Sequence, residues 1–440
     1  MSSESPKNPP AQPNDPPEAA GVTEPGGQNG GMTRRRFMGV AGAVAGAAAT
    51  GFSLPSLIGR AHANDPALHN PNSSRYIYAA SPGIEADVSF GGEGILVFDI
   101  DNNYQFVKRI PTFPPPIGPA VPEQVTGICA SAQLNMVYVC TTSKSQASAA
   151  SPAPGTIGAF NLTTGALVWQ FTLPDGVDRQ QITPDGLVPN DQMEIWSPSF
   201  RLDHWNVLNA LTGELKAQVS VTTRGAHNTC MSLDGKTCYL ASLNDPVLHK
   251  VDTATRTQVV GIGPFSASIR PFTINAAETL VYVNVNNLLG FGIGDAITGK
   301  VLAQIPVVGY PNSGRTKRHG TVSHGIGLTP DGTEIWLCDG LNSLLHIFDN
   351  TVWPPVQKPE VIALRDQPGW VSFSLDGKFA YPSTGEIVNI KTRQIVATLT
   401  DELGRQVGSE KLLEVDFKNK VRSGYVSNSF GIGPIPTYGS

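Results

Sequence analysis

The feature that most constrains this chain is a strand–turn–strand unit that recurs along it. In its clearest copy, residues 323–339, Ile326 and Leu328 alternate with small or polar residues, the period-two pattern of a half-buried strand. Thr329-Pro330-Asp331-Gly332 then has the composition of a tight turn. A second strand rich in bulky residues follows at Ile335-Trp336-Leu337. The segment therefore predicts a β-hairpin.

Similar hairpins recur with a spacing of roughly 40 to 50 residues, which indicates a repeat architecture. A third strand that ends near an Asp or Asn and a fourth strand follow each hairpin, as in residues 207–213 and 215–221. Four strands per repeat at this period are typical of a β-propeller blade. The further predicted hairpins lie at 128–139, 181–196, 231–240, 273–283 and 373–381.

The first repeat, residues 75–110, shows only three strands. The segment Lys411–Phe417 has strand character and no blade of its own. We predict that it supplies the missing inner strand and closes the ring, because closure removes exposed strand edges. The predicted fold is an all-β, seven-bladed β-propeller over residues 74–425, followed by a C-terminal tail at 426–440.

The N-terminal region is predicted to lie outside the propeller. Residues 1–32 are rich in Pro, Gly, Ser and Asn, and we interpret them as a disordered extension. Residues 33–63 resemble a twin-arginine (Tat) export signal. They contain Thr33-Arg34-Arg35-Arg36-Phe37-Met38, a small apolar run and Ala61-His62-Ala63. The resemblance implies a periplasmic or secreted protein that has no stable membrane span after cleavage, and the alternative is a single membrane anchor.

The repeats resemble the YVTN-type β-propeller family. Tyr282-Val283-Asn284-Val285 nearly reproduces the family's tetrapeptide, and residues 232–235 and 329–332 match its Ser-Pro-Asp-Gly turn. The resemblance covers nearly all of the chain after the signal. It implies the fold, and the family includes surface-layer-type and binding proteins. Wider relatives include the large subunit of quinone-dependent amine dehydrogenases and the propeller of nitrous-oxide reductase, but no site motif of those enzymes carries over.

Polar residues gather where the inner strands are predicted to begin, at one mouth of the central channel. Two histidines and a carboxylate there could bind a transition metal ion, with His227 and His324 as the candidate ligands. Arg270 suits a carboxylate or phosphate ligand. The alternative is that these residues only solvate a wet channel. Around the ring, the predicted positions are Thr126, Asp178, His227, Arg270, His324 and Gly369, with Trp370 beside the last.

Loops predicted on the same face add further candidates. His204 and Arg224 lie in two of them. The connection from Tyr310 to Ser323 carries Arg315, Lys317, Arg318 and His319, and it either attracts an anion or is a solvated surface loop.

The chain has five cysteines, of which Cys129 and Cys140, and Cys230 and Cys238, are predicted on adjacent strands. Exported proteins meet oxidising conditions, but adjacent-strand geometry is often poor for a disulfide, so we expect buried free thiols. The sequence contains no Cys-x-x-Cys-His, Gly-x-Ser-x-Gly or His-Glu-x-x-His motif and no phosphate loop.

These features predict an exported propeller that binds a small polar or anionic ligand, or a protein partner, at the channel mouth. One alternative is a periplasmic metal-dependent oxidoreductase or hydrolase that uses Asp178, His227, Arg270 and His324. A second alternative is a scaffold like the large subunit of a redox complex. The formal net charge of −5 argues against a nucleic-acid partner. Closure of the ring favours a monomer.

Overall fold

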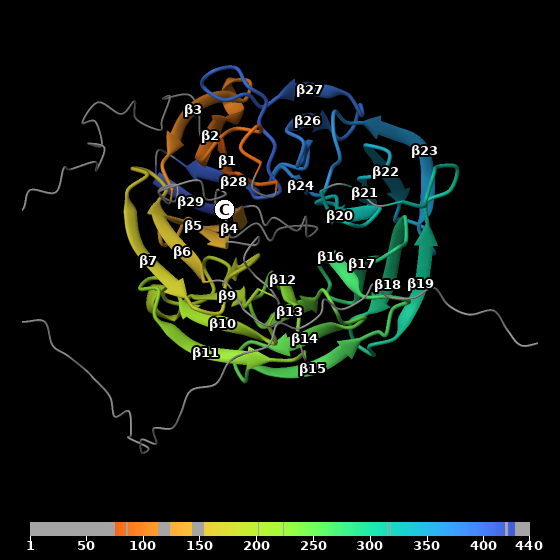
Figure 1. Cartoon of the computed structure of the whole chain (residues 1–440), viewed down its shortest axis with the longest axis horizontal. Helices are drawn as coiled ribbons and strands as arrows, with labels where there is room; N and C mark the ends of the chain where they lie inside the picture. The colour runs from red at the N-terminus through yellow and green to blue at the C-terminus, as the bar shows by residue number, and fades with distance from the viewer. Residues whose placement is uncertain are drawn as a thin grey trace, which may run out of the picture. The chain divides into compact units, whose positions relative to one another are not determined.

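The protein folds into seven antiparallel sheets arranged as a ring, so the predicted seven-bladed β-propeller is confirmed (Figure 1). The structure is a computed structural model. It describes residues 75–84, 87–112, 124–142, 154–200, 202–222, 224–314, 316, 318–418 and 421–426. The predicted extension and export signal lie outside these residues.

The blades follow one another along the chain, and blades 2 to 7 have four strands each. Blade 1 contains β1 (Arg75–Ser81), β2 (Gly94–Asp99), η1 (Ile100–Asn102), β3 (Gln105–Ile110), β28 (Leu412–Lys418) and β29 (Val421–Val426). Blade 2 contains β4 (Gln124–Ser131), β5 (Met136–Thr142), β6 (Gly155–Asn161) and β7 (Leu167–Leu173). Blade 3 contains β8 (Gln181–Ile182), η2 (Asn190–Gln192), β9 (Glu194–Pro198), β10 (His204–Asn209) and β11 (Leu215–Ser220).

The remaining four blades are regular repeats of the same unit. Blade 4 contains β12 (Ala226–Met231), β13 (Thr237–Ser242), β14 (Leu248–Asp252) and β15 (Thr257–Ile262). Blade 5 contains β16 (Ile269–Ile274), β17 (Leu280–Val285), β18 (Gly290–Asp295) and β19 (Val301–Pro306). Blade 6 contains β20 (Ser323–Leu328), β21 (Glu334–Asp339), β22 (Leu344–Asp349) and β23 (Val356–Ala363). Blade 7 contains β24 (Val371–Phe373), β25 (Phe379–Pro382), β26 (Glu386–Asn389) and β27 (Ile395–Thr398).

The hairpin turns form as their composition predicts. In blade 6 the Thr329 hydroxyl donates to Asp331 Oδ1 over 2.6 Å, and the same oxygen accepts from the backbone N–H of Thr333 over 3.0 Å. Gly332 has a φ of 72°, the left-handed conformation that a glycine adopts without a steric cost. Ser232 and Ser374 donate to Asp234 and Asp376 in the same way, over 2.8 Å and 2.7 Å. A single local hydrogen-bonding pattern therefore turns three of the blades.

Neighbouring blades pack their buried faces against each other. At the junction of blades 5 and 6, the rings of Phe291 and Phe348 meet edge to face with centroids 5.0 Å apart. The Tyr282 hydroxyl donates across the same junction to Asn350 Oδ1 over 3.1 Å. Burial of one such large apolar side chain contributes about 1.5–3 kcal/mol. Each blade is therefore stabilised chiefly by its two neighbours.

The ring closes where the two ends of the propeller meet in blade 1. Strand β28 pairs antiparallel with β1, with Ile77 opposite Glu414 and Arg75 opposite Asp416. The predicted closure by the C-terminal strand is therefore confirmed. A further strand, β29, pairs with β28 and makes blade 1 five-stranded, which the sequence analysis did not predict.

All five cysteines are buried thiols, as expected for the two pairs on adjacent strands, and Cys338 is buried as well. Within the part of the chain that the structure describes, no helix has the length and apolar character needed to cross a membrane.

The closing strand carries a buried carboxyl group, Glu414, and a half-buried one, Asp416, and both respond to pH. Burial, followed by repulsion from Asp416, raises the pKa of Glu414 from its usual 4.5 to about 8. Burial also raises the pKa of Asp416, from 3.8 to about 6. A folded state that holds these protons more tightly than the unfolded chain is most stable at low pH and loses that stability as pH rises through the folded pKa values.

We therefore expect Glu414→Gln to stabilise the protein relative to wild type by about 2 kcal/mol at pH 8 and by almost nothing at pH 5. Glutamine keeps an acceptor for the Tyr381 hydroxyl, which donates to Glu414 Oε2 over 3.0 Å. Urea unfolding of both proteins at several pH values measures the difference. If the difference in unfolding free energy between the two proteins is the same at every pH, ionisation of Glu414 does not destabilise the pairing of β1 with β28.

Candidate functional site

The channel mouth is the end of the ring where the inner strands β4, β8, β12, β16, β20, β24 and β28 begin. Four of these strands have irregular pairing at that end. A β-bulge bends a strand and re-aims the side chain that it carries. The shifted segments contain the predicted positions Thr126, His227, Arg270 and His324.

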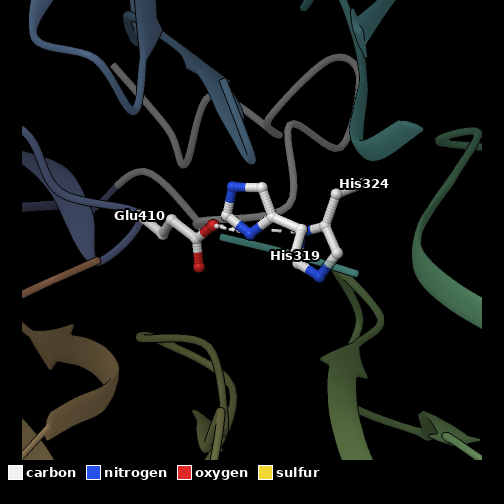
Figure 2. Close-up of side chains that lie close together, drawn as sticks. All are labelled: His319, His324 and Glu410. Carbon is white, nitrogen blue, oxygen red and sulfur yellow. Dashed lines mark ion pairs between the residues drawn. The ribbon is translucent and has the colours of Figure 1, made fainter. Parts of the chain in front are cut away.

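Glu410 lies at the mouth, just before β28, and contacts basic and imidazole side chains from other blades. Its Oε2 atom is 2.7 Å from Lys411 Nζ and 3.2 Å from the Arg179 guanidinium. Its Oε1 atom is 3.2 Å from His319 Nδ1 and 3.9 Å from His324 Nδ1 (Figure 2). These side chains come from blades 1, 3 and 6 and from the loop before blade 6, so the site exists only in the closed ring.

The two histidines form a stacked pair beside the carboxylate. Their ring centroids are 4.6 Å apart with an interplanar angle of 20°. Burial lowers the pKa of both imidazoles, and it places that of His324 well below its usual value, where the neighbouring His319 lowers it further. Burial alone would raise the pKa of Glu410, but the charge of Lys411 and the other basic neighbours holds it well below its usual range. At neutral pH the site therefore has two neutral imidazoles and an ionised carboxylate.

Positive charge exceeds negative charge around this carboxylate. Arg179, Lys411 and Arg270 all lie at the mouth, and Arg179 also stacks on Trp370, 4.9 Å from the ring centroid. Burial, and then the charge of Arg179, lowers the pKa of Arg270 to about 10. Burial is the main cause of this shift, and the repulsion by Arg179 adds to it because two positive charges lie close together. The mouth is therefore suited to a negatively charged ligand.

Asp178 and His227 form a second polar pair at the mouth. Asp178 Oδ2 is 2.5 Å from His227 Nδ1, and both side chains are almost fully buried. The ring of His227 also lies near Phe200, with centroids 6.3 Å apart. Since Arg179 directly follows Asp178, this pair adjoins the Glu410 cluster.

The other predicted site residues occupy different surroundings. His204 Nε2 is 2.5 Å from Asp175 Oδ2 and its Nδ1 is 2.9 Å from Asp203 Oδ1, at the start of the outer strand β10. None of the described contacts of His204 reaches the Glu410 cluster. Arg224 is exposed between β11 and β12. Trp370 lies at the mouth, buried beneath Arg179.

Two residues of the predicted basic loop, Arg318 and His319, have different surroundings. Arg318 pairs with Asp366 at 2.8 Å and Asp87 at 3.4 Å, and it stacks on Phe90. His319, its neighbour, turns into the mouth. Arg315 and Lys317 lie outside the described residues.

Arg179, Glu410 and Lys411 are site residues that the sequence did not predict, and His319 was predicted only as part of a basic loop. Site residues were predicted at the start of the inner strand in six of the blades. The same position at the start of β28, the closing strand of blade 1, is occupied by Glu410 and Lys411, which directly precede that strand. The loop position of His319 carried no comparable signal. The prediction that His227 and His324 bind one metal ion stays a prediction.

The fold defines the class of this protein as a seven-bladed β-propeller. No known protein-family model matches the chain, and no curated protein matches it either. The resemblance to the YVTN type therefore stays a prediction.

We expect Glu410→Gln to lower the free energy of unfolding by about 3 kcal/mol, because it leaves the buried Lys411 and Arg179 without their counter-charge. Urea unfolding at pH 7 measures the change. The exposed Glu214→Gln variant is the matched control and should stay within about 0.5 kcal/mol of wild type. Equal stabilities for the two variants would mean that Glu410 does not neutralise these cations.

Proposed function

We propose that this protein binds a small anionic ligand at the channel mouth, with Arg179, Arg270 and Lys411 as the cationic groups. The single observation that supports this most is the balance of three cationic side chains against two carboxylates, Glu410 and Asp178, in a mostly buried site. A carboxylate or phosphate group would neutralise the excess positive charge. Electrostatic attraction of this kind is strengthened by a surrounding of low dielectric.

The site contains charged and amide side chains around a cavity of about 10 Å³, which has room for about one water molecule. The cavity beside Glu410 and Lys411 is lined by Thr126, Gly127, Arg179, Gln180 and Trp370. The Arg270 guanidinium is held by Asn286, whose Oδ1 accepts from Nε over 2.6 Å. An arginine fixed in this way presents its remaining N–H groups with less loss of freedom on binding. The neutral imidazoles add hydrogen-bonding groups for the uncharged part of the ligand.

We also propose that the protein is an exported propeller of the YVTN type that acts in the periplasm or outside the cell. The Tat-like segment at residues 33–63 supports export, and the repeat turns support the family.

We expect inorganic phosphate to bind to the protein, and Arg270→Gln to weaken that binding about 10- to 100-fold, the effect of losing one charge-assisted hydrogen bond. Isothermal titration at low and high ionic strength measures the affinity, which should fall as salt screens the charges.

Lys300→Gln is the matched control, because Lys300 is an exposed cation in the turn before β19, at the opposite end of the strands. Arg270→Gln should not destabilise the fold as Glu410→Gln does, because it removes a positive charge that lies close to the positive charge of Arg179. Unchanged phosphate affinity in Arg270→Gln, or no binding of phosphate, citrate and acetate by wild type, would refute the proposed function.

Export is tested separately. The double substitution of Arg34 and Arg35 by Lys should leave the full-length protein in the cytoplasmic fraction of its host, since the twin-arginine pair is what defines this type of signal. Cell fractionation and immunoblotting measure the distribution, with wild type as the reference. Equal amounts of both proteins in the periplasm would contradict a Tat-type signal.

A further inference from the structure

Three side chains at the mouth have the composition and spacing of a metal site. His319, His324 and Glu410 each offer one ligand atom, and these atoms lie within 4.8 Å of one another. Figure 2 shows the three side chains converging from separate parts of the chain. Two imidazoles and one carboxylate form a ligand set that suits Zn²⁺ and related divalent transition metal ions, and three protein ligands leave one position open.

The surroundings hold these groups in a geometry that a metal ion could use. His324 Nδ1 lies 2.9 Å from the carbonyl oxygen of Gly369, and donation to that oxygen leaves Nε2, and not the Nδ1 atom that lies 3.9 Å from Glu410, as the nitrogen with a lone pair for a metal ion. Glu410 Oε2 is held by Lys411 and Arg179, so Oε1 is the oxygen nearest the histidines. Such outer contacts orient ligands and fix their tautomers at metal sites.

One ring nitrogen of His319, Nε2, is buried and lacks a hydrogen-bond partner among the residues that the structure describes, and it is a different atom from the Nδ1 nitrogen that faces Glu410. Buried polar atoms without partners are uncommon in folded proteins, and one explanation is an ion bound to them. The site is also closely packed, since a Cβ atom on Gly369 would lie 2.1 Å from Glu410 Oε1 and 2.3 Å from His319 Nε2. The His319 ring and the Glu410 carboxylate therefore both lie against Gly369, where a larger residue would not fit.

We propose that His319, His324 and Glu410 bind one divalent transition metal ion of the Zn²⁺ class, with a position left open for the anionic ligand. The metal site itself is independent of the proposed anion binding, but its coupling to an anion rests on that proposed function. A metal ion next to Arg179, Arg270 and Lys411 increases the positive charge of the mouth. An anion should therefore strengthen metal binding, and the metal ion should strengthen anion binding by the same factor.

The test uses protein passed over a chelating resin and titrated with zinc chloride in a buffer without phosphate, followed by calorimetry. We expect one Zn²⁺ ion per chain, and His319→Ala and His324→Ala should each weaken binding at least about 10-fold. The visible absorption of bound Co²⁺ gives a second readout of histidine coordination and should be lost in both variants. His319→Gln replaces the alanine variant if circular dichroism shows that the latter does not fold.

His249→Ala is the matched control, because His249 is a buried histidine of β14 that pairs with Asp245 and Gln258 instead. It should bind Zn²⁺ as wild type does. His227→Ala discriminates between the two possible sites. Wild-type protein that binds no Zn²⁺ in the micromolar range overturns the inference, and so does loss of binding in His227→Ala with retention in His319→Ala.

Phosphate binding by the same metal-depleted protein separates this inference from the proposed function. Protein that binds phosphate but no Zn²⁺ refutes the metal site alone. Protein that binds Zn²⁺ but no phosphate supports the metal site and refutes the anion site. An increase in Zn²⁺ affinity on addition of phosphate supports the coupling, whereas an unchanged or lower affinity refutes it.

Discussion

The antiparallel pairing of β1 with β28 is the interaction on which the rest of the structure depends. Each blade buries its faces only against its two neighbours, so an open ring would leave two faces and two strand edges in water. The pairing joins residues more than 300 positions apart in the chain, such as Ile77 and Glu414. Closing so long a loop costs conformational entropy, which the burial of the last junction must offset.

The same closure assembles the candidate site. Glu410 and Lys411 directly precede β28, and they meet Arg179 of blade 3 together with His319 and His324 from around blade 6. A single carboxylate thus links cations and imidazoles that lie far apart in sequence. The cations around this carboxylate outnumber the negative charges, which is why we infer an anionic ligand. The imidazoles beside the carboxylate are why we infer a metal ion whose binding is coupled to that of the anion. The stability of the ring closure and the binding properties of the channel mouth therefore depend on the same few side chains.

The fold could be predicted because short segments of the sequence determine its strands and turns. Alternating strands and turns such as Thr329-Pro330-Asp331-Gly332 need only neighbouring residues to form, and their repetition fixes the propeller. The inner-strand positions of His227, Arg270 and His324 followed from the same periodicity. Recurrent bulges at these positions then aim the side chains, and a bulge has no clear signature in one sequence. His319 reaches the site from a loop, where no period exists to reveal it. Strand β29 was missed because a repeat of four strands gives no reason to expect a fifth.

The order in which the site acquires its parts has a consequence for biosynthesis. Arg179, Arg270, His319 and His324 are all made before Glu410 and Lys411, which follow them in the chain. A nascent chain therefore has the arginines and imidazoles but not the carboxylate that organises them. Binding of the proposed ligand at the mouth must wait until Glu410 and Lys411 have been made, so an occupied mouth would report that the chain has reached the strand that closes the ring.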